Sequence, residues 1–341
     1  MPIVIGREDE IDKIKDIFLS SNYAVLSGLG GIGKTYTALL YAYHLQKSGG
    51  WITQCVTCEN ADSLQEAVAR LQFHGLEYDK NDLQFDIRLK ALQAHSKPII
   101  IIFDDFNLRF EQDDLKDLKK LTECTHARFI FTSRQKPLIN NRHIVKIKPM
   151  NTNSLLELYW HYRFDEDHPN KYDYINKHKE ILTKMFDLIG GHTLMIELLA
   201  KLPIRSGLSE CEIYNYLNNN LDVSSSETGI AKNDTLSISS AKVGVVKDDI
   251  YIDDNVNEII KKIFAVSKLN NVEKDIMTHM SLISTDGIKQ SLFEELTGYS
   301  PDELNSLKES NWIMMDERKL KLRLHPLIAE AALNIDETRP S

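Results

Sequence analysis

Cysteine, basic charge and long apolar runs are all scarce in this sequence. Only 4 of its 341 residues are cysteines, which is too few for a disulfide framework. Cys55 and Cys58 are spaced like half of a zinc site, but Cys124 and Cys211 stand singly elsewhere and do not form the other half. We therefore expect four reduced, unpaired thiols.

Basic residues are outnumbered by acidic ones, with 41 Lys and Arg against 50 Asp and Glu and a formal net charge of −9 at pH 7. This balance argues against a protein that grips nucleic acid along its whole surface, although it leaves room for a local basic face.

No run of apolar residues is long enough to cross a bilayer, which takes about 18 or more in succession. The first residues, Met1–Arg7, also lack the apolar region and the small-residue cleavage site of a signal peptide. We expect a cytoplasmic protein with no membrane partner.

The clearest motif is the segment Gly28–Thr35, which matches the phosphate-loop pattern G-x-x-x-x-G-K-[ST] without a mismatch. Its glycines let the backbone turn tightly, so that successive N–H groups point at a polyphosphate. Lys34 offers a positive charge to the β- and γ-phosphates, and Thr35 offers a hydroxyl ligand for Mg²⁺ at a helix N-terminus. The residues expected to contact the nucleotide here are Gly28, Gly30, Gly31, Ile32, Gly33, Lys34, Thr35 and Tyr36.

Strand-like and helix-like patterns alternate through residues 1–150, which predicts an α/β P-loop nucleotide-binding domain with a mostly parallel sheet. The run Ile99–Phe103 is apolar throughout and is typical of a strand in the middle of such a sheet. The alternating segment His143–Lys148 is expected to close the sheet at its edge. The other expected strands are Tyr23–Leu26, Trp51–Thr57 and Ala127–Arg134, and the expected helices are Glu8–Leu19, Asp62–Phe73, Asp82–Ala94 and one that contains Leu115, Leu118 and Leu121.

Beyond residue 150 the patterns change. Residues 151–217 show only helical periodicity, which predicts a small all-helical domain, and residues 218–250 are rich in Asn, Ser and Asp, as in a connector or insertion. Residues 251–341 are expected to form a winged-helix domain. Its second helix is expected to begin near Ile288, its third starts at the capping box Ser300–Glu303, and its wing pairs Ile313–Met315 with Leu320–Leu324.

Two acids and one arginine follow the predicted central strands. Asp104 stands at the carboxyl end of the apolar strand, where a parallel sheet opens onto its ligand, and is expected to hold Mg²⁺. Asp105 is placed to orient the attacking water, and Arg134 ends the next strand and could contact the γ-phosphate. The alternatives are a surface turn for the two acids and a solvated strand end for Arg134.

Six segments occur in the order that is typical of the NB-ARC class of STAND proteins (signal-transduction ATPases with numerous domains). This class includes plant disease-resistance receptors, apoptotic protease-activating factors and bacterial regulators. The chain resembles it over nearly its whole length. The segments are Ile5–Glu8, Gly28–Thr35, Ile99–Asp105, Thr132–Arg134, Gly190–Leu194 and Leu324–Leu327.

The resemblance implies further contacts with an adenine nucleotide. Val4, Gly6 and Arg7 would lie near the adenine and ribose, and Thr193 stands where the class has a proline that packs on the adenine. His325 would contact the β-phosphate of bound ADP. Read without the resemblance, His325 precedes Pro326 at a helix N-terminus, a place that attracts anions, although a lone histidine is more often structural.

The predicted function is an ADP-held, ATP-opened switch with slow Mg²⁺-dependent ATP hydrolysis. The resemblance also implies a nucleotide-dependent homo-oligomer, with effector and sensor domains outside this sequence. One alternative is a DNA-binding winged-helix regulator or an origin-recognition-type ATPase, and another is a constitutive ATPase. The third helix of the predicted winged helix, Asp302–Asn311, carries three acids and one lysine, a poor surface for phosphates, so we do not expect nucleic acid as a partner.

Overall fold

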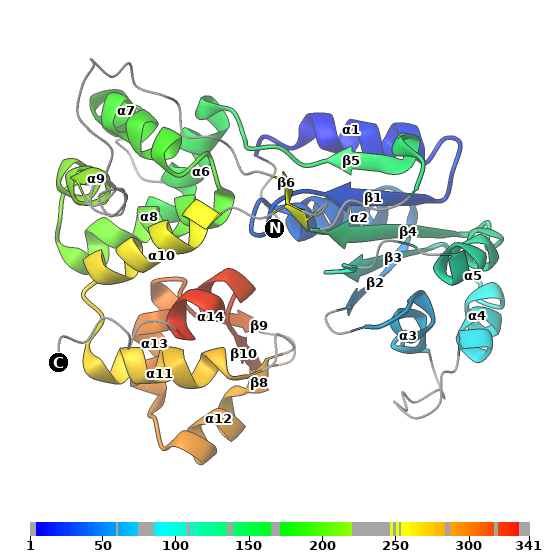
Figure 1. Ribbon diagram of the computed structural model, residues 1–341. Helices are drawn as coiled ribbons and strands as arrows, with labels where there is room; N and C mark the ends of the chain where they lie inside the picture. Colours follow the sequence, from blue (N-terminus) through cyan, green and yellow to red (C-terminus); the bar gives the residue numbers. More distant parts are fainter. Residues whose placement is uncertain are drawn as a thin grey trace. The chain divides into compact units, whose positions relative to one another are not determined.

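In the structure, a computed structural model, the chain divides into two compact units (Figure 1). The first unit comprises Met1–Lys148 with Val246–Ile252, and the second Pro149–Val245 with Asp253–Ser341. The structure describes residues 5–58, 61–73, 85–107, 110, 112–134, 139–164, 171–219, 246–247, 250–251, 254–283, 287–316 and 320–333.

The first unit is built on a five-stranded sheet in which every neighbouring pair of strands is parallel. The strand order is β2-β3-β4-β1-β5. The run Ile99–Phe103 in β3 is fully buried, and β5 lies at the sheet edge, so both of these predictions are confirmed. The strands are β1 (Tyr23–Ser27), β2 (Ile52–Thr57), β3 (Ile99–Asp104), β4 (Ala127–Ser133) and β5 (Ile144–Lys146).

Helices cover both faces of this sheet because successive strand residues point to opposite faces. On one face Ile100, Ile102 and Ile130 pack with α1 and α2. On the other, Ile101 and Phe103 pack with the remaining helices (Figure 1). The helices are α1 (Glu8–Ile17), α2 (Lys34–Gly49), α3 (Leu64–Ala69), α4 (Phe85–Gln93) and α5 (Gln112–Thr122).

The second unit begins with helices, as predicted for residues 151–217, and continues with helices and a small antiparallel sheet of strand order β8-β10-β9. A division of this unit into a helical domain and a winged helix stays a prediction. The helices are α6 (Thr152–Arg163), α7 (Lys171–Leu188), α8 (Thr193–Ser206), α9 (Glu210–Asn219), α10 (Asp254–Val266), α11 (Asn271–Ser281), α12 (Gln290–Thr297), α13 (Pro301–Glu309) and α14 (Pro326–Leu333). The strands are β8 (Ile288–Lys289), β9 (Met314–Asp316) and β10 (Lys321–Arg323).

One expectation for this unit was wrong, and one of its helices was missed. Ile288 was expected in a helix but begins β8, so the small sheet has three strands rather than two. The reason is the backbone of Gly287: its φ is +74°, and a Cβ there would lie 2.4 Å from the carbonyl oxygen of Leu322. This close approach places the residues after Gly287 beside β10, where they pair before α12 begins. Helix α10 was not predicted at all.

The predicted connector 218–250 falls mostly outside the described residues. Its described part includes the last two residues of α9 and the two-residue strand β6 (Val246–Lys247), which pairs antiparallel with β7 (Ile250–Tyr251). In the described part of the chain, no helix has both the length and the apolarity that a bilayer crossing requires.

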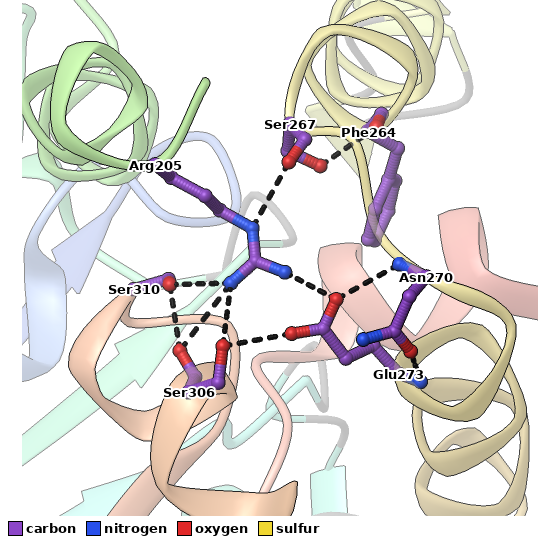
Figure 2. Close-up of polar contacts among 7 residues, drawn as sticks. All are labelled: Arg205, Phe264, Ser267, Asn270, Glu273, Ser306 and Ser310. Atoms are coloured by element: carbon purple, nitrogen blue, oxygen red, sulfur yellow. Dashed lines mark hydrogen bonds and ion pairs between the residues drawn. The ribbon is translucent and has the colours of Figure 1, made fainter. Parts of the chain in front are cut away.

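A partly buried arginine joins four helical segments of the second unit (Figure 2). Arg205, in the last turn of α8, donates from Nε to the carbonyl oxygen of Ser267, 3.0 Å away, just after α10. Its Nη1 donates to the hydroxyls of Ser306 on α13 and of Ser310, which caps the end of that helix, at 3.0 and 2.8 Å. Its Nη2 pairs with Glu273 on α11. One guanidinium therefore fixes α8 against the three later helices.

Candidate functional site

The phosphate loop connects the end of β1 to the start of α2, as the motif predicts. Gly31 and Gly33 have φ of +66° and +103°, in the left-handed region that favours glycine. Gly28 is required for a different reason: a Cβ at this position would lie 2.8 Å from the carbonyl oxygen of Ile147. The glycines therefore allow both the turn of the loop and its contact with the segment after β5.

Lys34 is buried under this loop. Its Nζ donates to the carbonyl oxygens of Gly28 and Leu29, at 2.9 and 2.7 Å. Burial lowers the pKa of Lys34 to about 8, and the positive charge of Arg134 acts in the same direction, against the acids Asp105 and Asp104. The ammonium group is thus short of negative charge, and an anion in the loop would supply it.

Thr35 and Asp104, the two predicted metal ligands, lie in direct contact. The Thr35 hydroxyl donates to Oδ1 of Asp104 over 2.6 Å, which joins the first turn of α2 to the end of β3. Hydroxyl and carboxylate oxygens are the donors that Mg²⁺ prefers, so this pair fits the predicted metal.

Thr132 accompanies this pair, a role that was not predicted from the sequence. Its hydroxyl donates to the same oxygen of Asp104 over 2.6 Å and accepts the backbone N–H of Asp105 over 2.9 Å. The signal that could have identified Thr132 is its position near the end of the predicted strand that precedes Arg134. That signal is informative only once β3 and β4 are known to be neighbours.

Asp105 and Arg134, both predicted from the sequence, form an ion pair with 3.4 Å between Nε of Arg134 and Oδ1 of Asp105. Asp105 has a φ of +57°, a left-handed conformation that is uncommon outside glycine. Asn107 contacts both residues: its Nδ2 donates to Oδ1 of Asp105 over 2.8 Å, and its Oδ1 accepts the backbone N–H of Arg134 over 2.9 Å. This role of Asn107 was not predicted from the sequence.

Arg7 is only 1% exposed and makes its contacts within the protein. Its guanidinium donates to the carbonyl oxygens of Ile32, in the phosphate loop, and of Lys148, at 2.5 and 2.7 Å. Gly6 has a φ of +62°. Val4 lies outside the described residues, and contacts of this segment with adenine and ribose stay a prediction.

The remaining predicted contacts, Thr193 and His325, belong to the second unit. Thr193 begins α8 shortly after Gly190 and Gly191, two glycines with positive φ at which the backbone turns. His325 precedes α14, and its Nδ1 accepts the backbone N–H of Leu327 over 3.2 Å. This bond makes the imidazole a cap for the helix and leaves the ring proton of the neutral form on Nε2. Their roles toward a nucleotide stay predictions.

Comparison with known proteins supports the fold. No protein-family model and no curated protein sequence matches the chain. Among solved structures, a STAND protein with a tetratricopeptide repeat sensor from Pyrococcus horikoshii matches at a TM-score of 0.54 and 17% identity. The match covers 100% of this chain but only 43% of that one, so the chain spans less than half the length of this relative.

Two further matches each have a TM-score of 0.43 and 14% identity, which is too low to show a shared fold. They are a Walker-type ATPase from Pyrococcus abyssi, with 96% of each chain covered, and a Drosophila origin recognition complex bound to DNA, with 96% of this chain and 95% of that one covered. The first match, together with the phosphate loop and its parallel sheet, confirms the resemblance at the level of fold: the chain has the fold of a STAND-class P-loop ATPase core.

Proposed function

We propose that this chain is an adenine-nucleotide-operated switch that hydrolyses ATP slowly and with Mg²⁺. The observation that carries the proposal is the contact of Thr35 with Asp104, at 2.6 Å, beside the ion pair of Asp105 and Arg134. Three elements of phosphoryl transfer are thereby gathered: a phosphate cradle, a pair of metal ligands and an acid next to a positive charge.

Each residue has a distinct task in this proposal. The loop amides and Lys34 bind the β- and γ-phosphates, and Thr35 and Asp104 would hold Mg²⁺, which supplies positive charge to the phosphate oxygens. Asp105 orients the attacking water, and Arg134 contacts the γ-phosphate, so the charge of Arg134 distinguishes ATP from ADP.

In the proposed switch, ADP is held by the phosphate loop and by His325, and exchange for ATP releases the second unit from the nucleotide and promotes opening or oligomerisation. A ligand shifts such an equilibrium only by its difference in affinity for the two states. His325 is proposed to supply much of that difference. By analogy with the Pyrococcus horikoshii protein, whose name includes a tetratricopeptide repeat sensor, we propose a sensor domain outside this chain. An effector domain outside it is expected from the resemblance to STAND proteins alone.

The assignment of the phosphate loop is tested by Lys34→Ala. Loss of the buried ammonium group should abolish the binding of ADP and ATP in isothermal titration calorimetry. Lys184→Ala, at an exposed position of α7, is the matched control and should bind as the unmodified protein does. Micromolar affinity retained in Lys34→Ala would contradict the assignment.

The origin-recognition-type alternative requires a surface for DNA phosphates. On α13 the exposed side chains include Asp302 and Glu309, and Ser306 and Ser310 are bonded to Arg205. These observations favour the switch over a DNA reader. Nanomolar binding of duplex DNA in a low-salt mobility-shift titration would reverse this choice.

A further inference from the structure

Asn107 lies just beyond the point where the regular backbone pairing of β3 with β4 ends. The backbone pairing of β3 with β4 runs in register as far as Phe103 and Phe131. Beyond that point the chain turns at Asp105, and the only further backbone contact described between these segments is the N–H of Phe106 to the carbonyl of Thr132, 2.8 Å long. The backbone N–H of Arg134 is then bonded by the Asn107 side chain instead.

One amide group therefore fixes both members of the candidate ion pair. Its Nδ2 restrains the Asp105 carboxylate and its Oδ1 restrains the main chain of Arg134. The ion pair holds these groups less firmly, because its two atoms are 3.4 Å apart and its side chains are 29% and 21% exposed, whereas the bonds of Asn107 are 2.8 and 2.9 Å long. The arrangement of the two charges thus depends on Asn107.

We propose that Asn107 is a positioning residue that holds Arg134 and Asp105 in one arrangement and thereby sets the preference of the site for a nucleoside triphosphate over the diphosphate. The inference rests on the proposed function, because Arg134 is assigned there to the γ-phosphate. A displaced Arg134 still leaves the phosphate loop and Lys34 intact. The binding of a diphosphate therefore does not depend on Asn107, and the binding of a triphosphate does.

Binding measurements test this dependence. Asn107→Ala should weaken the affinity for the non-hydrolysable triphosphate adenosine 5′-(β,γ-imido)triphosphate by about tenfold, which corresponds to one charge-assisted hydrogen bond. The affinity for ADP should stay within about twofold of the original, because the cradle is unchanged. The matched control is Asn22→Ala, which removes a side-chain bond to the carbonyl of Thr122 in the same unit, 2.8 Å long, and should leave both affinities unchanged. Equal losses for the two nucleotides in Asn107→Ala would overturn the proposal.

A double-variant cycle separates positioning from general loosening. If Asn107 acts through Arg134, the variant that combines Asn107→Ala with Arg134→Ala should lose no more triphosphate affinity than Arg134→Ala alone. Additive losses would overturn the proposal, since they would mean that Asn107 acts independently of Arg134.

Amide hydrogen exchange gives a readout that needs no nucleotide. The Arg134 N–H should be protected in the unmodified protein and in the control Asn22→Ala, and should exchange faster in Asn107→Ala, which removes the acceptor of this N–H. Protection retained in Asn107→Ala would overturn the proposal. If the unmodified protein binds neither nucleotide, the proposed function fails together with this inference. If it prefers the triphosphate and Asn107→Ala keeps that preference, only this inference fails.

Discussion

At the scale of single residues, the phosphate loop depends on positions where a side chain would not fit and glycine is therefore needed. Gly28 shows this most directly, because the space that its Cβ would need is taken by the main-chain carbonyl of Ile147. A backbone atom cannot move aside as a flexible side chain can. The glycine is therefore required by the packing of the loop as well as by its conformation.

Gly28→Ala should lower the free energy of unfolding by about 1–3 kcal/mol, the usual cost of overpacking, and weaken ADP binding. Gly49→Ala is the matched control: Gly49 ends α2 and its Cβ would meet only the Trp51 ring, at 3.5 Å. That variant should be as stable as the original or more stable by up to about 1 kcal/mol. Urea unfolding and calorimetry measure both effects, and equal stability of the two variants would contradict the argument.

A second residue-scale prediction concerns Glu197 on α8. Burial raises the pKa of its carboxyl to about 7, against the opposing effects of Lys201 and of a hydrogen bond from Tyr162. Because the folded pKa is above the unfolded value of about 4.5, the stabilisation by this group is complete below about pH 4.5 and is lost as the pH rises to about 7.

Glu197→Gln should therefore flatten the dependence of the unfolding free energy on pH between 5 and 7 and raise stability at pH 8. Glu157→Gln, at an exposed position of α6, controls for the substitution itself. Urea unfolding at pH 5, 6, 7 and 8 would show it, and a pH profile of Glu197→Gln that is parallel to the original would refute the assignment.

At the scale of helices and strands, the joint around Arg205 combines a nearly buried ion pair with hydrogen bonds. The side chains of Arg205 and Glu273 are 13% and 7% exposed. Burial on its own would raise the pKa of Glu273, but hydrogen bonds from Arg205, Asn270 and Ser306 lower it. The carboxylate is thus held in its charged form.

Glu273→Ala should lower the free energy of unfolding by about 2–4 kcal/mol, somewhat less than the loss of a fully buried partner, because the nearly buried Arg205 charge loses its only described acidic partner but keeps its bonds to Ser267, Ser306 and Ser310. Glu180→Ala removes one member of an exposed pair with Lys184, whose side chains are 85% and 51% exposed, and should cost under about 1 kcal/mol. Chemical denaturation compares the two. Similar losses would mean that the Arg205 joint is no stronger than a surface pair.

Sequence patterns predicted the helices and strands themselves better than they predicted which of them lie side by side. The alternation of strands and helices in the first unit is confirmed, and so is the capping box of α13. Both could be predicted because they depend on residues that are close together in the chain. The strand β8 was missed because it exists only through its pairing with β10. Helix α10 could have been found, since Ile259, Ile260 and Ile263 are buried at helical spacing.

The residues of the candidate site also fall into those that local sequence predicted and those that depend on strand neighbours. Lys34, Thr35 and Asp104 were predicted because a motif and a strand end identify them. Thr132 and Asn107 were missed because their roles depend on β3 lying next to β4, which the order of the strands in the chain does not reveal. The residues that hold the predicted ones in place are therefore the part that required a structure.

At the scale of the whole molecule, the proposed switch makes His325 a residue with two tasks. It caps α14 in the structure and is proposed to bind ADP. His325→Ala removes both functions, whereas His325→Asn keeps a side-chain acceptor for the Leu327 N–H and removes only the imidazole.

Both variants should release ADP faster than the original protein and sediment as larger species, and only the alanine variant should also lose about 1 kcal/mol of stability. Stopped-flow release of a fluorescent ADP, sedimentation velocity and thermal unfolding would measure these effects. Unchanged ADP release in His325→Asn would rule out the proposed role, whatever the alanine variant does.

Arg7 links the phosphate loop to the place where the chain leaves the first unit. One guanidinium donates to Ile32 in the loop and to Lys148, the last residue before the second unit begins. Because one guanidinium donates to both carbonyl oxygens, a displacement of either one would strain its bond to Arg7. The phosphate loop and the end of the first unit are thus held by the same side chain, although they lie more than one hundred residues apart in the chain.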